Sequence, residues 1–178
     1  TLRYNGKGKF KSPTNPRPIY IITTAKKRDS GDWEKECYAF RIFDVVVDSW
    51  NNIKKYTKVH SAFFIFDEQR VVGYGAWVKA FLQISRKNEW ILLSATPGDN
   101  WSDYIPVFVA NKFYNNKTEF LAMHAIYSRY AKYPKIERWM DTDILEKHRA
   151  AVLVTMPFTK RTTQRHIDIQ CDYDKKKY

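Results

Sequence analysis

Cysteine is scarce in this sequence: Cys37 and Cys171 are the only two, and they lie far apart. No CxxC pair or cluster of cysteine and histidine accompanies them, so the spacing of a zinc site is missing. The four histidines share no ligand spacing either, and we interpret each as structural: His60, His124, His148 and His166. Two thiols in a chain of 178 residues are typical of a reduced, intracellular protein, and we expect a cytoplasmic location.

Long apolar runs are missing as well. No stretch approaches the roughly 18 apolar residues that a membrane-spanning helix needs, and no signal peptide is recognisable. We therefore expect no membrane partner. Internal repeats and low-complexity tracts are also absent, and a chain of 178 residues suits one domain with one sizeable core.

A nucleotide-phosphate loop is missing, although one segment resembles it. The segment "YNGKGKFKS" contains Gly8-Lys9, but such a loop has the order Gly, four residues, Gly, Lys and then Ser or Thr. Phe10 follows Lys9, and no glycine stands five positions before Gly8. We therefore do not interpret this segment as a phosphate-binding loop.

Acidic residues are the minority among the charged residues. The sequence has 31 lysines and arginines against 19 acids, a net charge of +12 and a pI near 9.6. This excess favours a polyanionic partner, DNA or RNA, and a basic surface that serves only solubility is the alternative. Some of the 12 tyrosines and 6 tryptophans are available to stack on bases, although most must form the core.

Strand-like apolar segments alternate with helical patterns in the first part of the chain. The predicted strands are Ile19–Thr23, Val45–Val47, Phe63–Phe66 and Ile91–Leu93. Helical spacing is predicted after Asp29 or Ser30, which are candidate caps, and again in "GAWVKAFLQISRK". This alternation predicts an α/β fold with right-handed crossovers and a parallel sheet that helices cover on both faces.

The pattern changes after Gly98. The segments "DYIPVFVANKFY" and "TEFLAMHAIYSRYAKYPKIERWM" are predicted to be mostly helical, and "ILEKHRAAVLVTMP" is predicted to be a helix that leads into a late strand. Asp141 and Asp143 precede that helix and are interpreted as caps. An extended exit strand is predicted in "TTQRHIDIQCDYDKKKY", where Ile167 and Ile169 alternate with polar residues.

Two adjacent carboxylates, Asp67 and Glu68, follow the apolar run "FFIF" directly. The carboxyl edge of the strands is where open α/β sheets keep their ligand sites. The pair is suited to holding a metal ion and activating water. A solvated turn after a strand is the alternative.

Four segments in a fixed order carry a resemblance to a known family: "ITTAKKRDSGDWEKE", "VVVDSW", "FFIFDEQR" and "LLSATPGDNW". Together they resemble the first RecA-like lobe of superfamily-two (DEAD/DEAH-like) helicases and DNA translocases, and especially short phage-encoded members. The resemblance covers roughly residues 18 to 178. It implies a P-loop NTPase-type lobe, a RecA-like parallel sheet sandwiched between helices, which uses ATP and Mg²⁺ in the cytoplasm of a bacterial or phage-infected host cell.

The same resemblance implies that parts of the family's machinery are not in this chain. The family places its phosphate loop upstream of the "IITTA" strand and a second lobe after the exit strand. We therefore expect residues 1–17 to be a basic linker, 18–170 to be the helicase lobe, and 171–178 to be a charged exit segment toward a missing second lobe. Either the chain is a fragment of a longer enzyme, or it is a degenerate lobe.

The resemblance also assigns roles to the two carboxylates and their neighbours. Asp67 would hold the Mg²⁺ that bridges the nucleotide phosphates, and Glu68 would orient or deprotonate the attacking water, which is the help that phosphoryl transfer needs. Gln69 and Arg70 depart from the commoner residues of the family, but Gln69 is polar and is expected to couple the site to the next strand.

Further roles follow from the remaining motifs. Ser94 and Thr96 would hydrogen-bond to the "DEQR" segment and relay the nucleotide state. The candidates for contact with nucleic-acid phosphates are Thr24, Lys26, Lys27 and Arg28, with a solvated helix start as the alternative reading. The other motif residues are expected elsewhere: Trp33 in the core, Trp101 as a packing anchor, and the "DSW" group, Asp48 to Trp50, in a second track-facing motif.

The implied activity is ATP hydrolysis coupled to movement on nucleic acid, which makes the parent protein an ATP-hydrolysing helicase or translocase, whereas this chain alone is expected to be inactive. The alternative is a non-enzymatic DNA-binding or protein-interaction module that retains the motifs as relics. A metal-dependent nuclease that uses Asp67 and Glu68 is a third possibility. It lacks a third acid and a lysine at recognisable spacing.

Overall fold

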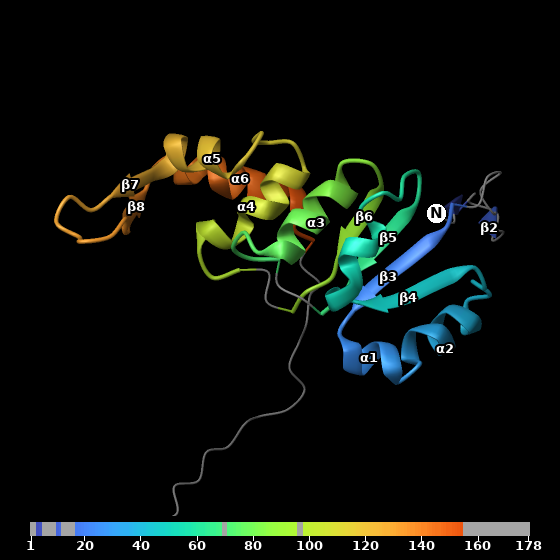
Figure 1. Ribbon diagram of the computed structural model, residues 1–178. Coiled ribbons are helices and arrows are strands. Elements are labelled where there is room, and N and C mark those ends of the chain that lie inside the picture. Colours follow the sequence, from blue (N-terminus) through green and yellow to red (C-terminus); the bar gives the residue numbers. More distant parts are fainter. Residues whose placement is uncertain (1–2, 5–9, 12–16, 69–70, 96–97, 155–178) are drawn as a thin grey trace, which may run out of the picture.

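A four-stranded sheet, parallel throughout, forms the centre of the computed structural model, which describes residues 3–4, 10–11, 17–68, 71–95 and 98–154 (Figure 1). Its strands are β3 (Ile19–Thr23), β4 (Val45–Ser49), β5 (Phe63–Phe66) and β6 (Glu89–Leu92). They are arranged in the order β4-β3-β5-β6. The predicted α/β class and the parallel pairing are therefore confirmed.

Helices form each crossover between the strands. The connections are α1 (Ala25–Asp29) and α2 (Asp32–Ala39) before β4, the 3-10 helix η1 (Trp50–Tyr56) before β5, and α3 (Ala76–Ser85) before β6. The predicted helix after Asp29 or Ser30 is confirmed as α2, but its N-cap is Gly31, and a short additional helix, α1, precedes it. Thr24 caps α1, and Gly31 begins α2 with a positive φ of 67°, a conformation that glycine adopts without steric cost.

The two central strands are buried because their side chains are apolar. Ile22 of β3 pairs with Phe66 of β5, and neither side chain is exposed. Phe64 stacks on Tyr20 at 4.9 Å between ring centroids, on the face that η1 and α3 cover (Figure 1). The expected cover on both faces is incomplete at the edge strand β6 in the described part of the chain, where Ile91 is 41% exposed.

The second half of the described chain packs beside α3. Its elements are α4 (Trp101–Ala110), α5 (Lys117–His124), the hairpin strands β7 (Ala125–Tyr127) and β8 (Ile136–Trp139), and α6 (Thr142–Val152). The helical prediction for "TEFLAMHAIYSRYAKYPKIERWM" is therefore wrong from Ala125 onward. Pro134 cannot continue a helix, and the β-branched and aromatic residues on either side of it favour strands.

The start of α6 differs from the expected cap. Asp141 occupies the position before the helix with a φ of 51°, but its side chain makes no capping hydrogen bond. Its carboxylate instead lies 3.4 Å from Nδ1 of the buried His124. Asp143 lies in the first turn, where an acid is favourable to the helix dipole.

Two further predictions concern the ends of the chain. Residues 1–17, expected to be a linker, contain a short antiparallel pair, β1 (Arg3–Tyr4) and β2 (Phe10–Lys11). The predicted late strand and the charged exit segment 171–178 lie outside the described residues. Among the helices that the structure describes, none has the length and apolar character needed to cross a bilayer.

Candidate functional site at the carboxyl edge of the sheet

Asp67 lies where β5 ends, at the carboxyl edge of the parallel sheet. Its backbone amide donates to the carbonyl of Ile22 at 2.8 Å, and its own carbonyl accepts from the indole Nε1 of Trp50 at 3.0 Å. These two bonds fix the backbone on both sides of the residue. The side chain is buried, with Asp67 only 5% exposed.

Three donors converge on one carboxylate oxygen of Asp67. Oδ2 accepts from the hydroxyl of Thr23 at 3.1 Å and from the indole Nε1 of Trp33 at 2.9 Å, and it lies 3.0 Å from Nζ of Lys27. Such hydrogen bonds and a neighbouring cation offset the free-energy cost of burying a carboxylate. The other oxygen, Oδ1, accepts no hydrogen bond from the described part of the chain, so it is the one free to contact a ligand.

Glu68 adopts a conformation that separates its side chain from that of Asp67. Its φ is 55°, which lies in the left-handed region that residues other than glycine rarely occupy. Backbone strain of this kind is concentrated at functional sites. The result is a pair of adjacent acids in different environments, with the Asp67 side chain buried and that of Glu68 50% exposed.

Lys27 joins the two acids. Its Nζ lies 2.9 Å from Oε1 of Glu68 and 3.0 Å from Oδ2 of Asp67, and it stands over the ring of Trp33 at 5.6 Å. The hydrogen bonds with Glu68 and then with Asp67 raise the pKa of this lysine above its ordinary value. Sequence reasoning placed Lys27 on the nucleic-acid side, whereas the structure places it in the carboxylate cluster.

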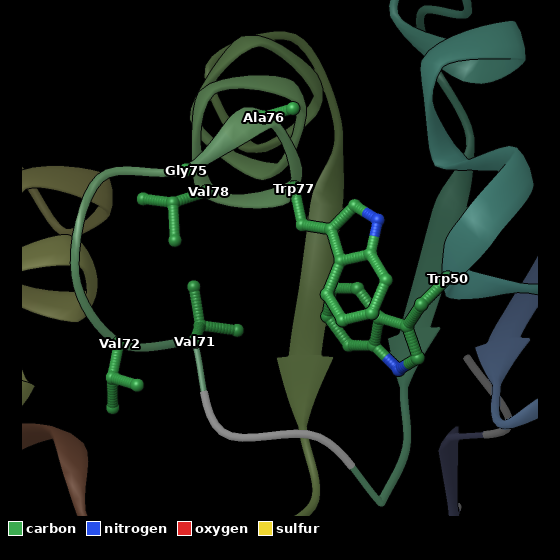
Figure 2. Close-up of a pocket in the computed structure, with 7 residues that line it drawn as sticks. All are labelled: Trp50, Val71, Val72, Gly75, Ala76, Trp77 and Val78. Carbon is green, nitrogen blue, oxygen red and sulfur yellow. The ribbon is translucent and has the colours of Figure 1, made fainter.

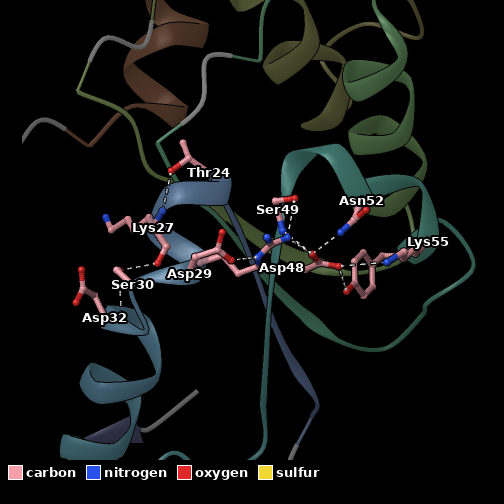
Figure 3. A network of polar contacts seen from close by, with 11 residues as sticks. Thr24, Lys27, Asp29, Ser30, Asp32, Asp48, Ser49, Asn52 and Lys55 are labelled. Atoms are coloured by element: carbon pink, nitrogen blue, oxygen red, sulfur yellow. Dashed lines mark hydrogen bonds and ion pairs between the residues drawn. The ribbon is translucent and has the colours of Figure 1, made fainter.

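The other predicted nucleic-acid contacts divide into two groups, and Figure 3 shows one of them, Thr24, with its bond from the Lys27 amide. Lys26 is exposed, and the hydroxyl of Thr24 accepts from the backbone amide of Lys27 as the cap of α1. Arg28, by contrast, is partly buried, and its guanidinium forms ion pairs with Asp29 at 2.8 Å and with Asp48 at 3.5 Å. Lys26 is therefore the cation of this segment that stays available to a phosphate.

Asp48 organises a second polar cluster, at the end of β4. Its carboxylate accepts from the Ser49 amide at 2.7 Å, the Asn52 side chain at 2.8 Å and the Tyr56 hydroxyl at 2.7 Å. Burial raises the pKa of Asp48, but these hydrogen bonds outweigh burial and leave the pKa below its ordinary value. Burial, followed by the bond to Asp48, raises the pKa of Tyr56. This cluster fixes the turn into η1.

Of the remaining predicted residues, Ser94 is the one within the described ranges, and it lies next to the same edge. The Leu93 amide donates to the carbonyl of Phe66 at 2.7 Å, so pairing between β5 and its neighbour continues to this point. Ser94 follows directly and is exposed, which places it beside the Asp67–Glu68 segment. Gln69 and Thr96 lie outside the described residues.

Two tryptophans lie in positions that differ from those expected from the sequence. Trp33, expected in the core, is half-buried and donates to the Asp67 carboxylate. Trp50, expected to face the track, is 3% exposed and supports the Asp67 backbone. Both indole nitrogens therefore serve to position Asp67.

An apolar cavity of about 260 Å³ lies next to this site (Figure 2). Its lining consists of Trp50, Val71, Val72, Gly75, Ala76, Trp77 and Val78. The rings of Trp50 and Trp77 lie 6.3 Å apart within it. The lining residues that the structure describes are uncharged, and nucleotide phosphates are bound by cations or backbone amides.

The acids of the site suit Mg²⁺ bound to a nucleotide better than a metal site made by protein alone. The described ranges hold no group of three or more His, Cys, Asp or Glu residues that could bind a metal. Mg²⁺ is commonly held by one or two carboxylates together with phosphates and water, and Asp67 with Glu68 meets that need. Lys27 supplies the lysine that a nuclease requires, but the third acid is not found among these residues.

Comparison with protein-family models, with curated proteins and with solved structures gives no match to this chain. The site is therefore interpreted from its own geometry.

Trp33→Phe is expected to lower the free energy of unfolding by about 1.5–3 kcal/mol, because a hydrogen bond to a buried charged group contributes that much. Urea unfolding measures the change. Trp101→Phe is the matched control, since Trp101 is also half-buried but its indole nitrogen donates to no residue of the described chain. Equal losses in the two variants would contradict a role for the Trp33 hydrogen bond.

Proposed function

We propose that this chain is the first RecA-like lobe of an ATP-dependent nucleic-acid helicase or translocase of the superfamily-two class. The observation that carries the proposal is the Asp67–Glu68 pair at the carboxyl edge of a central parallel strand. One acid is buried and hydrogen-bonded, and the next is exposed with a left-handed backbone. The proposal assigns the phosphate loop and the second lobe to other parts of a longer protein.

The two acids divide the work of ATP hydrolysis between them. Mg²⁺ bound with the nucleotide neutralises charge on the phosphates, and Asp67 is the residue suited to hold it. Thr23 and Trp33 donate to Oδ2 of Asp67, and Oδ1 accepts no hydrogen bond from the described residues. Glu68 is exposed and accepts the proton of the attacking water, a role in which a carboxylate needs access to solvent and substrate.

Lys27 acts as a counter-ion for both acids. Two carboxylates side by side repel each other, and an ammonium at 2.9 and 3.0 Å offsets that repulsion. An ammonium group is also a common partner of nucleotide phosphates. We infer that Lys27 exchanges its carboxylate contacts for phosphate contacts when Mg²⁺ and nucleotide bind.

Contacts with the nucleic-acid track are assigned to the α1 segment. Thr24 and the exposed Lys26 contact phosphates of DNA or RNA, whereas Lys27 and Arg28 are already paired with acids. Ser94 and Thr96 link the end of the neighbouring strand to the acids and so couple hydrolysis to movement. Such a link needs only a small free-energy difference between two states.

A non-enzymatic lobe is the second candidate function, and one observation favours it. Lys27 pairs with both Asp67 and Glu68, so each acid already has a protein partner that offsets part of the pair's negative charge. In that case the fold would serve as a DNA-binding or protein-interaction module.

Strand displacement distinguishes the two candidates. A protein that joins this lobe to a Gly-Lys-Ser/Thr loop and a second lobe is expected to separate a labelled partial duplex only when ATP and Mg²⁺ are both present. The 178-residue chain is expected to show negligible activity, because the backbone amides and lysine that cradle the phosphates are missing from it. ATP-independent binding without displacement by the longer protein would favour the non-enzymatic module.

A further inference from the structure

The β7–β8 hairpin extends beyond helices α4, α5 and α6 at one end of the molecule (Figure 1). Its strands are short, Ala125–Tyr127 and Ile136–Trp139, and a turn of eight residues, 128–135, joins them. The side chain of Tyr130 is 98% exposed, that of Tyr133 is 73% exposed, and that of Tyr127 is 41% exposed. Tyr130 and Tyr133 on the projecting turn make no contribution to a core, and Tyr127 at the end of β7 is only partly covered, so their position calls for another explanation.

The charged residues of the hairpin are almost all of one sign. Between Ala125 and Trp139 the sequence has four cations and a single acid, Glu137. All four cations are exposed: Arg129, Lys132, Lys135 and Arg138. The tip therefore alternates aromatic and basic residues in "YSRYAKYPK", and Lys132 stands over the ring of Tyr133 at 5.8 Å.

The base of the hairpin is fixed to the folded body. The Ser128 amide donates to the carbonyl of Lys135 at 2.9 Å, and the Met140 amide donates to the carbonyl of His124 at 2.8 Å. The ring of Trp139 packs on the fully buried Phe120 at 5.8 Å. A tip held this way presents its side chains with little cost in conformational entropy when a ligand binds.

We propose that this hairpin is a binding site for single-stranded nucleic acid, in which Tyr130 and Tyr133 stack on unpaired bases and the four cations contact the phosphates. Stacking platforms interleaved with cations are the recurring solution for strands bound without sequence preference. An acidic protein surface would also be attracted to the cations, and tyrosine is common at protein interfaces, so an acidic protein partner is one outcome of the test below.

The hairpin site adds to the nucleic-acid contacts assigned to α1 and lies on different elements. It adds a second contact with the nucleic-acid partner of the proposed function, and binding at this site does not depend on ATP hydrolysis. Binding is measured without ATP, so failure of the hairpin site and failure of the proposed ATPase are distinguishable.

Fluorescence anisotropy of the 178-residue chain with labelled oligo(dT) and oligo(U) tests the proposal, and their relative affinities identify DNA or RNA as the better ligand. Dissociation constants of about 1–100 μM near physiological salt are expected for such contacts. Tyr130→Ala with Tyr133→Ala is expected to weaken binding by about tenfold for each ring. The double Phe variant keeps both π faces and should retain the affinity of the parent chain.

Tyr38→Ala is the matched control, because Tyr38 on α2 is 72% exposed and lies far from the hairpin in the fold (Figure 1). It is expected to bind like the parent chain. Equal weakening in Tyr38→Ala and the double Ala variant would overturn the proposal, as would unchanged binding in the double Ala variant. Circular dichroism checks that each variant keeps its fold.

Two further arms separate stacking from simple charge attraction. A matched duplex should bind more weakly than the single strand, because its bases are not available to the tyrosines. Lys132→Gln with Lys135→Gln should reduce the slope of log affinity against log salt by about 1.4, since each phosphate contact on a single strand contributes about 0.7. A polyglutamate peptide that binds as tightly as oligo(dT) would overturn the proposal in favour of an acidic protein partner.

Discussion

Glu68→Gln is expected to lower nucleic-acid-stimulated ATP turnover by about 10²- to 10⁴-fold, the usual contribution of a positioned general base. Glutamine keeps the size and polarity of the side chain but cannot accept the proton of the attacking water. The assay follows phosphate release by the protein that carries this lobe together with a phosphate loop and a second lobe. The fold should be unchanged, because the Glu68 side chain is half exposed and glutamine meets the same backbone strain.

Glu146→Gln is the matched control for this change. Glu146 is an exposed acid on α6 that pairs with Arg149 at 2.7 Å and has no ion pair or hydrogen bond with Asp67, Glu68 or Lys27. Its replacement should leave ATP turnover unchanged. A loss of less than about tenfold in Glu68→Gln, or a comparable loss in both variants, would contradict the role given to Glu68.

Phe108→Ala is expected to lower the free energy of unfolding by about 3–5 kcal/mol, the range for a fully buried phenylalanine. Phe108 on α4 has no exposed surface. Its ring contacts those of Tyr104, Phe113 and Phe120 at centroid distances of 5.7, 6.0 and 6.1 Å. Alanine leaves a cavity in a part of the core that joins α4 to α5.

Urea unfolding followed by circular dichroism measures this loss. Phe40→Ala is the control, since Phe40 is 70% exposed and should change stability by no more than about 0.5 kcal/mol. A loss below about 1 kcal/mol in Phe108→Ala would mean that α4 and α5 do not share a packed core in solution.

The sheet was predictable from the sequence because its strands are apolar and short. "IYIIT" and "FFIF" have the β-branched and aromatic composition of buried strands, and helical patterns between them require parallel pairing. The hairpin was not predictable in this way. Its strands of three and four residues follow directly on α5, and so short a run carries no clear period.

The candidate site was predictable only in part. Asp67 and Glu68 could be found because the end of a strand is local information. Lys27, Trp33 and Thr23 could not be assigned to Asp67, since they come from the crossover before β4 and from the end of β3. They meet Asp67 only because β3 and β5 pair in the register that places Ile22 beside Phe66.

The edge strand shows the same limit in another form. The apolar residues of "WILL" suggest cover on both faces, yet Ile91 is 41% and Leu93 is 39% exposed. Composition indicates whether a side chain can be buried, whereas its actual burial depends on which helices pack against it. Here α1 and α2 pack beside β4 at the opposite edge of the sheet.

The rate of phosphate release from ATP, with and without single-stranded nucleic acid, tests the central claim most directly. It is measured on the protein that carries this lobe with a phosphate loop and a second lobe. We predict turnover on the order of 1 per second with nucleic acid and a clearly slower rate without it. No hydrolysis, or the same rate in both conditions, would contradict the assignment of Asp67 and Glu68 to a nucleic-acid-dependent ATPase.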